Sequence, residues 1–427
     1  MTIGAITLLA TFALTILIDI PIAFGLALSS IAYLLIFDAA PLMVSAQQFV
    51  AGMDSFTLLA IPLFVLAAQL MNSAGLTATI IRLCSAAVGD IKGGLAVVAV
   101  LASILFGALS GSGVADVVAI GSVLLPAMYR SGYGKGFSCA LLGCAGSLGT
   151  VIPPSIVMIV YGTTTNTSVG KLFLGGVIPG ILLGCALIAV VLWQSRKHGW
   201  AGGNPFDRRD FLVALKEALP ALLVPVLIIG GIRMGVFTAT EAAASAILYA
   251  LAVGFLIYRE LDWPIVWKCL RNTGETSASI LLIIGAAGLF AWILVAEHVP
   301  QVLATLLSEW TSSRTAVLLV IMSALLVLGT FMETIAIIII VAPVVMPAIH
   351  QYGIDPVHFG ILLTVNLAIG ANTPPLGVDL MAACRIGGIS MVESFKPLLM
   401  MVGAMIVVLL LLTFAPEIVL FLPQRMK

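Results

Sequence analysis

The sequences GSLGTVIPPS (146–155) and GANTPPLG (370–377) interrupt two segments that are otherwise apolar enough to cross a membrane as helices. A proline lacks an N–H and clashes with the carbonyl four residues earlier, which costs about 3 kcal/mol in a helix interior. Two consecutive prolines therefore predict that each helix opens and that the preceding carbonyls lose their helical partners. Carbonyls at membrane depth are tolerated only where they are buried or line a cavity. They are also the oxygen ligands that a dehydrated cation needs.

The two interruptions occupy equivalent places in the two halves of the chain. An offset of 221 residues aligns Gly149 with Gly370 and the pair Pro153–Pro154 with Pro374–Pro375. The same offset, or one of 222, aligns further pairs: Gly107/Gly329, Val123/Val344, Pro126/Pro347, Ala127/Ala348 and Gly132/Gly353. Interrupted helices in corresponding halves are the best sequence indication of the binding site of a secondary transporter.

The composition agrees with a membrane protein. Of 427 residues, 61% are hydrophobic and 9% are charged, against about 25% charged in a soluble domain. The formal net charge of zero gives no reason to propose a nucleic-acid partner. The six cysteines form no CxxC pair and are expected to pack between helices. The four histidines lie in no HExxH motif, and GxSxG is absent too, so we do not expect an enzyme.

The apolar runs predict an all-α, polytopic membrane protein made of two repeats, residues 1–205 and 206–427. Each repeat has five spans and one apolar stretch of roughly 35 residues with polar residues in its middle, which is too long for one span. We therefore expect two re-entrant hairpins, at 94–128 and 315–349. The interrupted helices are expected at 136–162 and 357–384, and the third span of the second half near 276–297.

An odd number of spans per repeat predicts that the second repeat is inverted relative to the first. With the polar linker 195–215 placed in the cytoplasm, 14 of the 19 lysines and arginines fall inside and 5 fall outside. This bias follows the positive-inside rule, and it is independent of the hydropathy that locates the spans. Both termini are then expected on the outer, periplasmic side.

The two hairpins, the IPPS motif at 152–155 and the NTPP motif at 372–375 resemble the large membrane subunit of the tripartite ATP-independent periplasmic (TRAP) transporters, over essentially the whole chain. The resemblance implies a bacterial inner-membrane protein that works with a small four-helix membrane subunit and a periplasmic substrate-binding protein. It also implies Na⁺-driven uptake of an organic acid, of the sialic acid or dicarboxylate type, by an elevator movement. We expect the small subunit to be a separate chain.

A stand-alone Na⁺/dicarboxylate symporter of the same superfamily, without partner subunits, is the alternative. Neighbouring genes for a four-span protein and a secreted binding protein would discriminate the two.

Two Na⁺ sites are expected where each hairpin tip meets the interrupted helix of its own half. Hydroxyl and backbone oxygens suit Na⁺, whereas clustered carboxylates would suit Ca²⁺. The expected residues of the first site are Ser103, Gly107, Ser110, Ser112, Gly146, Gly149, Thr150 and Pro153. Those of the second site are Gly329, Thr330, Thr334, Gly370, Asn372 and Thr373. The structural alternative is that these hydroxyls bond only to carbonyls of their own helices.

The resemblance implies that the substrate lies between the two ion sites, and helix N-termini directed there would favour a carboxylate. Ser110 and Ser155 align with Met332 and Leu376, and this asymmetry suits an asymmetric substrate, so both serines are candidate contacts. Asp116 and Glu333 are further candidates because carboxylates inside a membrane are costly and usually functional. The alternatives are that Asp116 caps the returning helix and that Glu333 bonds to a buried polar group.

Overall fold

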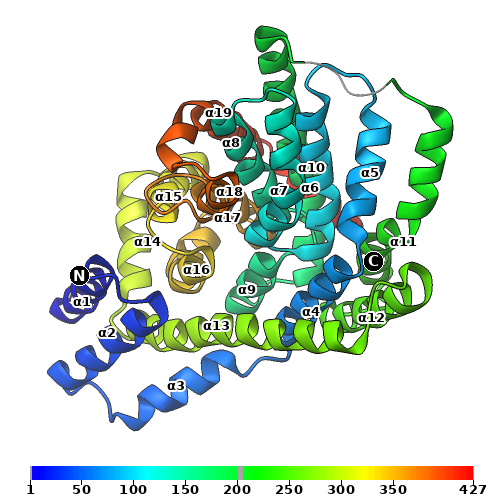
Figure 1. Cartoon of the computed structure of the whole chain (residues 1–427). Helices are drawn as coiled ribbons and strands as arrows, with labels where there is room; N and C mark the ends of the chain where they lie inside the picture. The colour runs from blue at the N-terminus through cyan, green and yellow to red at the C-terminus, as the bar shows by residue number, and fades with distance from the viewer. Residues whose placement is uncertain (1, 201–204, 427) are drawn as a thin grey trace.

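The computed structural model describes residues 2–200 and 205–426, and the regular elements in these ranges are helical (Figure 1). Within these ranges eight helical stretches are long and apolar enough to cross a bilayer. They are Phe56–Ser73, Gly113–Arg130, Val169–His198, Arg208–Arg233, Ala239–Tyr258, Trp263–Ala296, Thr334–Gln351 and Met391–Phe414. The predicted class, an all-α polytopic membrane protein, is confirmed.

One group of helices, which we call the frame, comes from the start of each half. It consists of α1 (Ile3–Leu17), α2 (Ile22–Phe37), α3 (Met43–Met53), the 3₁₀ turn η1 (Phe56–Leu59), α4 (Ala60–Ser73), α11 (Arg208–Arg233), α12 (Ala239–Ala252) with the π-turn Val253–Tyr258, and α13 (Trp263–Ala296). In Figure 1, helix α13 runs across the lower part of the molecule, above α3, from α12 toward α2, and it packs against α2, α3 and α4. Gly52 and Gly288 let α3 and α13 approach closely, because a methyl group on Gly288 would lie 3.1 Å from the Cα of Gly52.

The second group, which we call the core unit, contains the two hairpins, the two interrupted helices and the long helix that follows each. Its members from the first half are α6 (Gly94–Ser110), α7 (Gly113–Arg130), α8 (Lys135–Gly146), the 3₁₀ turn η2 (Ser147–Thr150), α9 (Ile156–Thr165) and α10 (Val169–His198). Those from the second half are α15 (Arg314–Gly329), α16 (Thr334–Gln351), α17 (Pro356–Gly370), α18 (Val378–Gly387) and α19 (Met391–Phe414), followed by α20 (Pro416–Leu420) and η4 (Pro423–Arg425). The halves interlock, since α8 packs on both α18 and α19.

Both interrupted helices break at the double prolines. Helix α8 ends at Gly146 and α9 begins at Ile156, while α17 ends at Gly370 and α18 begins at Val378. The bonds Pro153–Pro154 and Pro374–Pro375 are both cis. The order of elements recurs in the two halves, but the inverted placement of the repeats in a membrane stays a prediction.

Two short helices that the hydropathy pattern did not predict precede the hairpins. They are α5 (Leu76–Val88) before α6 and α14 (Val299–Trp310) before α15. Each has an apolar face against its neighbours and a polar face, so neither contains an uninterrupted apolar run. Helix α5 is also tied to α11 by ion pairs from Arg82 to Asp210 (3.3 Å) and Glu217 (2.5 Å).

The predicted third span of the second half lies within a helix that is longer than the apolar run. Helix α13 begins at Trp263, not near residue 276, and its 34 residues make a helix about 50 Å long. The first turns contain Lys268, Arg271 and Glu275, which lower the hydropathy of the segment. They are helical because Val266, Cys269 and Thr273 form a buried stripe at helical spacing.

The N-terminal helix is held by Glu297, which follows α13 and accepts hydrogen bonds from the hydroxyls of Thr2 and Tyr33. These bonds lower the pKa of Glu297 below its ordinary value. We expect Tyr33→Phe to lower the free energy of unfolding by about 1 kcal/mol at neutral pH, because one donor to a partly exposed carboxylate is lost. Thermal unfolding in detergent measures the loss.

The pH dependence has a defined sign. A carboxyl group whose pKa is lower in the folded than in the unfolded protein stabilises the fold at pH values above its unfolded pKa. This stabilisation is lost as the pH falls through the folded pKa. The difference in stability between wild type and Tyr33→Phe should therefore shrink in acid. An equal difference at neutral and acid pH would show that the hydrogen bond to the Glu297 carboxylate is not what Tyr33 contributes.

Candidate substrate and cation site

A cavity of about 530 Å³ lies between the core unit and the frame. The core unit supplies both hairpin tips and both helix breaks, and the frame supplies residues of α4 and α13. Lining residues from the core unit include Ser110–Ala115, Thr150, Ile156, Glu333–Ile335, Ala371, Val378 and Asp379. From the frame they are Val65, Ala68, Gln69, Asn72, Thr276 and Ile280. Six segments of the chain thus meet at one cavity: two hairpin tips, two helix breaks, α4 and α13.

Four helices begin at this cavity. The first residues of α7, α9, α16 and α18 (Gly113, Ile156, Thr334 and Val378) all line it. A helix N-terminus carries unpaired N–H groups and about half a positive charge, and so favours an anion. Among the described residues that line the cavity there is no lysine or arginine. Any anion held here would therefore be bound by backbone dipoles, hydroxyls and accompanying cations.

In the first half, hairpin and break touch through their backbones. A methyl group on Gly107 would lie 2.7 Å from the Cα of Gly149, and 3.1 Å from Oδ2 of Asp116. The same carboxylate oxygen lies against Gly149. Asp116 is fully buried, and its other oxygen accepts a hydrogen bond from the hydroxyl of Ser110. Only glycines leave room for this contact, which brings the carboxylate to the break.

The second half repeats the glycine contact without the carboxylate. A methyl group on Gly370 would lie 2.9 Å from the Cα of Gly329. The N–H of Leu376 donates to the carbonyl of Thr330 (3.0 Å), which ties the segment after the prolines to the second hairpin tip. In the first half the N–H of Ile156 is bonded in the same way to the carbonyl of Gly111 (3.4 Å). Each break is thus joined to the hairpin of its own half.

The carbonyls before the prolines are only partly free. The Thr150 carbonyl accepts the hydroxyl of Ser155 (2.5 Å), and the Ala371 carbonyl accepts the N–H of Asp379 (2.9 Å). The Gly370 carbonyl accepts the N–H of Thr373 (2.9 Å). For Gly149, the described part of the chain offers its carbonyl no donor. A carbonyl oxygen has two lone pairs, so one accepted bond does not remove it as a cation ligand.

Four buried side-chain oxygens near the breaks have no hydrogen-bond partner among the described residues. They are Ser103 Oγ, Asp116 Oδ2, Asn372 Oδ1 and Asp379 Oδ2. A buried acceptor without a donor is costly, and a cation would satisfy it. Among the described residues, no three or more His, Cys, Asp or Glu side chains are placed so that they could hold a metal ion together. The donor set is therefore mixed, with hydroxyl, amide and backbone oxygens around isolated carboxylates, which suits Na⁺ better than Ca²⁺.

The remaining residues expected in the two ion sites lie around the same breaks. Ser112 is the N-cap residue of α7, Gly146 packs against α7 at Gly113 and Val117, and Pro153 is buried. The hydroxyls of Thr330 and Thr373 donate to carbonyls of their own helices, Val327 and Ile369, as the structural alternative expects. Their part in a cation site, and that of Thr334 at the cavity, stays a prediction.

The predicted substrate residues differ in their surroundings. Ser110 lines the cavity, whereas Ser155 is fully buried and caps α9 by accepting the N–H of Met158 (3.3 Å). Glu333 lines the cavity and caps α16, because it accepts the N–H groups of Ile335 (2.9 Å) and Ala336 (3.2 Å). The capping alternative considered for Asp116 is thus seen at Glu333, while Asp116 bonds across the hairpin tip to Ser110.

Asp379, an intramembrane carboxylate that the sequence makes a weaker candidate than Asp116 and Glu333 because it could lie close to an interface, is buried and lines the cavity. Its carboxylate lies against Gly113 at the start of α7, so the second half contributes a carboxylate to the hairpin tip of the first. Its position just after the second break could have indicated this. Gln69, Asn72 and Thr276 of the frame were missed, although each is a polar residue at the end of an apolar span.

Comparison with known proteins adds the family context. Residues 9–418 match the family described as Tripartite ATP-independent periplasmic transporter, DctM component. The isethionate TRAP transporter permease protein DctMQ of Oleidesulfovibrio alaskensis is 40% identical over 96% of this chain, which spans 65% of that relative's length. The C4-dicarboxylate large permease protein DctM of Pseudomonas aeruginosa is 40% identical over 94% of both chains. The sialic acid large permease protein SiaM of Vibrio cholerae is 38% identical over 95% of both.

Solved structures resemble the fold at low sequence identity. The YdaH transporter of Alcanivorax borkumensis has a TM-score of 0.60 at 16% identity, covering 87% of each chain. MtrF of Neisseria gonorrhoeae has a TM-score of 0.59 at 14% identity, covering 86% of this chain and 83% of its own. At these identities the likeness concerns the fold alone, and it is a fold of membrane transporters.

The glycine contact makes a direct prediction. Gly107→Ala should reduce transport at least tenfold and lower stability by about 1–3 kcal/mol, because a methyl group would force hairpin and break apart. Gly403→Ala in α19 is the matched control, since a methyl group there meets nothing within 4 Å. Uptake and thermal unfolding are measured on both variants. Wild-type uptake by Gly107→Ala would show that the close contact is not needed.

Proposed function

The chain belongs to the family of DctM components, the large permease proteins of TRAP transporters, and from this premise we propose that it carries an organic acid inward together with Na⁺. The observation that carries the proposal is the convergence of four helix N-termini with unpartnered buried oxygens at one cavity. The N-termini favour a carboxylate or sulfonate. The unpartnered oxygens favour cations.

The named solutes of the relatives agree with this chemistry. Isethionate, C4-dicarboxylates and sialic acid are given for three relatives, and all are organic acids. We extend only this class to the present chain. Because no basic side chain lines the cavity in its described residues, Na⁺ would supply the positive charge beside the bound acid. Binding of the acid and of Na⁺ would then be mutually dependent, which is the basis of coupling.

Coupling also gives the process a driving force. A positive charge that moves inward gains about 2.3 kcal/mol per 100 mV of membrane potential. A monoanion that enters with two Na⁺ carries one net positive charge, so the potential and the Na⁺ gradient both favour accumulation. A bacterial inner-membrane location with both termini in the periplasm is part of the same proposal.

We propose as partners a small membrane subunit and a periplasmic binding protein, as in other TRAP transporters. We propose that the small subunit is a separate chain. This is a proposal because one relative, which is longer than the present chain, carries the joint name DctMQ.

The movement that we propose is an elevator shift of the core unit along the frame. The main cavity meets α4 and α13 at Gln69, Asn72 and Thr276. A second cavity, of about 370 Å³, lies toward the opposite ends of the same two helices and is lined by Ser55, Leu58, Ile284 and Ala291 together with α9 and α16. A cavity thus lies between the frame and the core unit toward each end of α4 and α13. By the distribution of charge, the main cavity lies toward the cytoplasm, so the structure would represent an inward-facing state.

The function is tested by uptake into liposomes. We expect accumulation of an organic acid only when Na⁺, the small subunit and the binding protein are all present, with Ser110→Ala lowering uptake at least tenfold. Ser122→Ala is the matched control, because that serine lies on the same hairpin and is exposed. Uptake that persists at the same rate with K⁺ in place of Na⁺ would refute the coupling. Equal uptake by this chain alone would support the stand-alone symporter instead.

The elevator movement is tested by cross-linking after replacement of the native cysteines. Cysteines at Thr334 and Thr276, which line the same cavity, should cross-link in the inward-facing state. Cysteines at Thr334 and Ala291, which lie at different cavities, should cross-link only after the core unit has moved. Cross-linking of the first pair alone, under all conditions and in active protein, would contradict the shift.

A further inference from the structure

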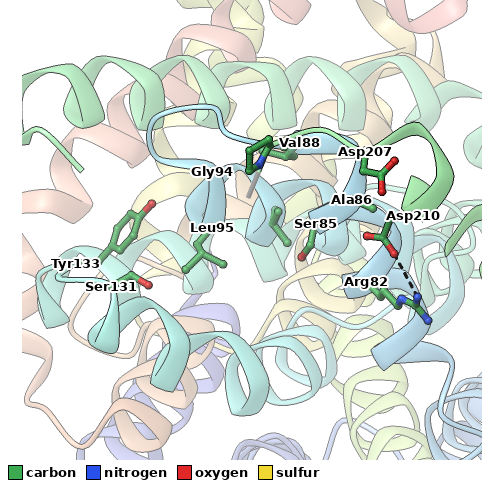
Figure 2. Close-up of a pocket in the computed structure, with 13 residues that line it drawn as sticks. Arg82, Ser85, Ala86, Val88, Gly94, Leu95, Ser131, Tyr133, Asp207 and Asp210 are labelled. Atoms are coloured by element: carbon green, nitrogen blue, oxygen red, sulfur yellow. Dashed lines mark hydrogen bonds and ion pairs between the residues drawn. The ribbon is translucent and has the colours of Figure 1, made fainter. Parts of the chain in front are cut away.

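Two carboxylates, those of Glu333 and Asp379, line the main cavity between the core unit and the frame, and the described residues that line it include no lysine or arginine. A different cavity, which lies beside the linker between the two halves, shows the usual compensation. There the guanidinium of Arg82 pairs with the carboxylate of Asp210 (3.3 Å), as Figure 2 shows. An ionised carboxylate away from bulk water is costly unless a cation or hydrogen-bond donors compensate it. The main cavity therefore needs a positive charge that its own side chains do not supply.

Asp379 is the less compensated of the two carboxylates. Glu333 accepts the N–H groups of Ile335 and Ala336 at the start of α16. Asp379 is 2% exposed, and its Oδ2 has no hydrogen-bond partner in the described residues. A buried acceptor without a donor costs free energy. A positively charged donor at Asp379 would remove this cost.

The two proposed Na⁺ sites do not account for this carboxylate. Each of those sites lies at the glycine contact between a hairpin and the break of its own half. The Asp379 carboxylate lies instead against Gly113 at the start of α7, where a methyl group would be 2.5 Å from its Oδ2. Asp379 also lines the cavity in which the substrate is proposed to bind. The positive charge that it needs can therefore be a group of the substrate itself.

Beside Asp379, the start of α7 offers hydrogen-bond donors. Its N-cap residue, Ser112, provides no side-chain cap, and the first N–H that is bonded is that of Asp116, which donates to the Ser112 carbonyl (3.1 Å). The N–H groups of residues 113–115 donate to no acceptor in the described part of the chain. All three of these residues line the cavity. Free N–H groups at a helix N-terminus bind a carboxylate or a sulfonate. An unpartnered acceptor and three free donors thus meet at Gly113.

We propose that the substrate is a zwitterion, with its acid group at the N–H groups of residues 113–115 and an ammonium group at Asp379. Because the donors and the acceptor share Gly113, the two charged groups of the substrate lie close together, as they do in an α-amino acid or in an aminosulfonate such as taurine. An ammonium at Asp379 favours the ionised form of that carboxylate. This inference rests on the proposed function, because it names the substrate class of the same cavity.

The test compares pairs of acids that differ only in an amino or a hydroxyl group: taurine and isethionate, alanine and lactate, and phenylalanine and phenyllactate. Each compound is titrated against the purified full chain in Na⁺, and its apparent Kd is obtained from the rise in unfolding temperature. We expect the amino member of at least one pair to bind about tenfold more tightly than its hydroxy partner, because a charged donor replaces a neutral one at Asp379.

Asp379→Asn should reduce this preference to within about twofold, because the side chain keeps its size and loses its charge. The variant should still be stabilised by Na⁺, which shows that it is folded and that the ion sites are intact. Asp210→Asn is the matched control, because Asp210 lies at the other cavity and not at the main one. It should keep the preference of the wild type.

Three results would overturn the proposal. The first is that no amino member binds more tightly than its hydroxy partner. The second is an unchanged preference in folded Asp379→Asn. The third is loss of the Na⁺ response in Asp379→Asn, which would assign the carboxylate to Na⁺. Tighter binding of the hydroxy acids, with Na⁺ still required, would leave the proposed function standing. A wild-type chain that responds neither to Na⁺ nor to any of these acids would contradict the proposed function as well.

Discussion

The close contact between each hairpin and the interrupted helix of its own half is the constraint on which the site depends. Gly107 meets Gly149 and Gly329 meets Gly370 at distances that leave no room for a side chain. The contacts hold the hairpin tips against the breaks, so that α7, α9, α16 and α18 begin at one cavity. They also place Asp116 directly at the first break. The convergence of helix N-termini and the buried oxygen acceptors at the breaks therefore both depend on the same backbone contact.

The two halves are not equivalent at this cavity. Asp116 of the first half and Asp379 of the second are buried, and at the offset of 221 they align with Ile337 and Met158. The Asp379 carboxylate packs against α7 of the other half, so the halves share one polar centre. Cation sites can repeat, whereas a single asymmetric acid needs one asymmetric pocket. Asp116 and Asp379 are thus positions at which the two repeats of this chain differ.

Much of this arrangement could be predicted from the sequence, and the rest could not for physical reasons. Double prolines act on their own helix, so the breaks near Gly149 and Gly370 were predictable. The family could be recognised from the same motifs. Helices α5 and α14 were not predicted because an amphipathic helix has no continuous apolar run. The first turns of α13 were not predicted because Lys268 and Arg271 lower the hydropathy of the segment that contains its buried stripe. The contact of Asp379 with α7 of the other half and the place of Gln69 at the cavity depend on tertiary packing; the sequence marks both only as polar residues beside a break or at the end of an apolar span.

The central claim is that the junctions of hairpins and breaks bind Na⁺. It is tested most directly by thermal unfolding of the purified chain in detergent, without substrate or partners, in Na⁺ and in K⁺ at equal ionic strength. A ligand that binds only the folded state stabilises it in proportion to the logarithm of its concentration. We predict that Na⁺, but not K⁺, raises the unfolding temperature and that Asp116→Asn loses most of this rise. Equal stabilisation by both ions, or an unchanged response in Asp116→Asn, would contradict the account.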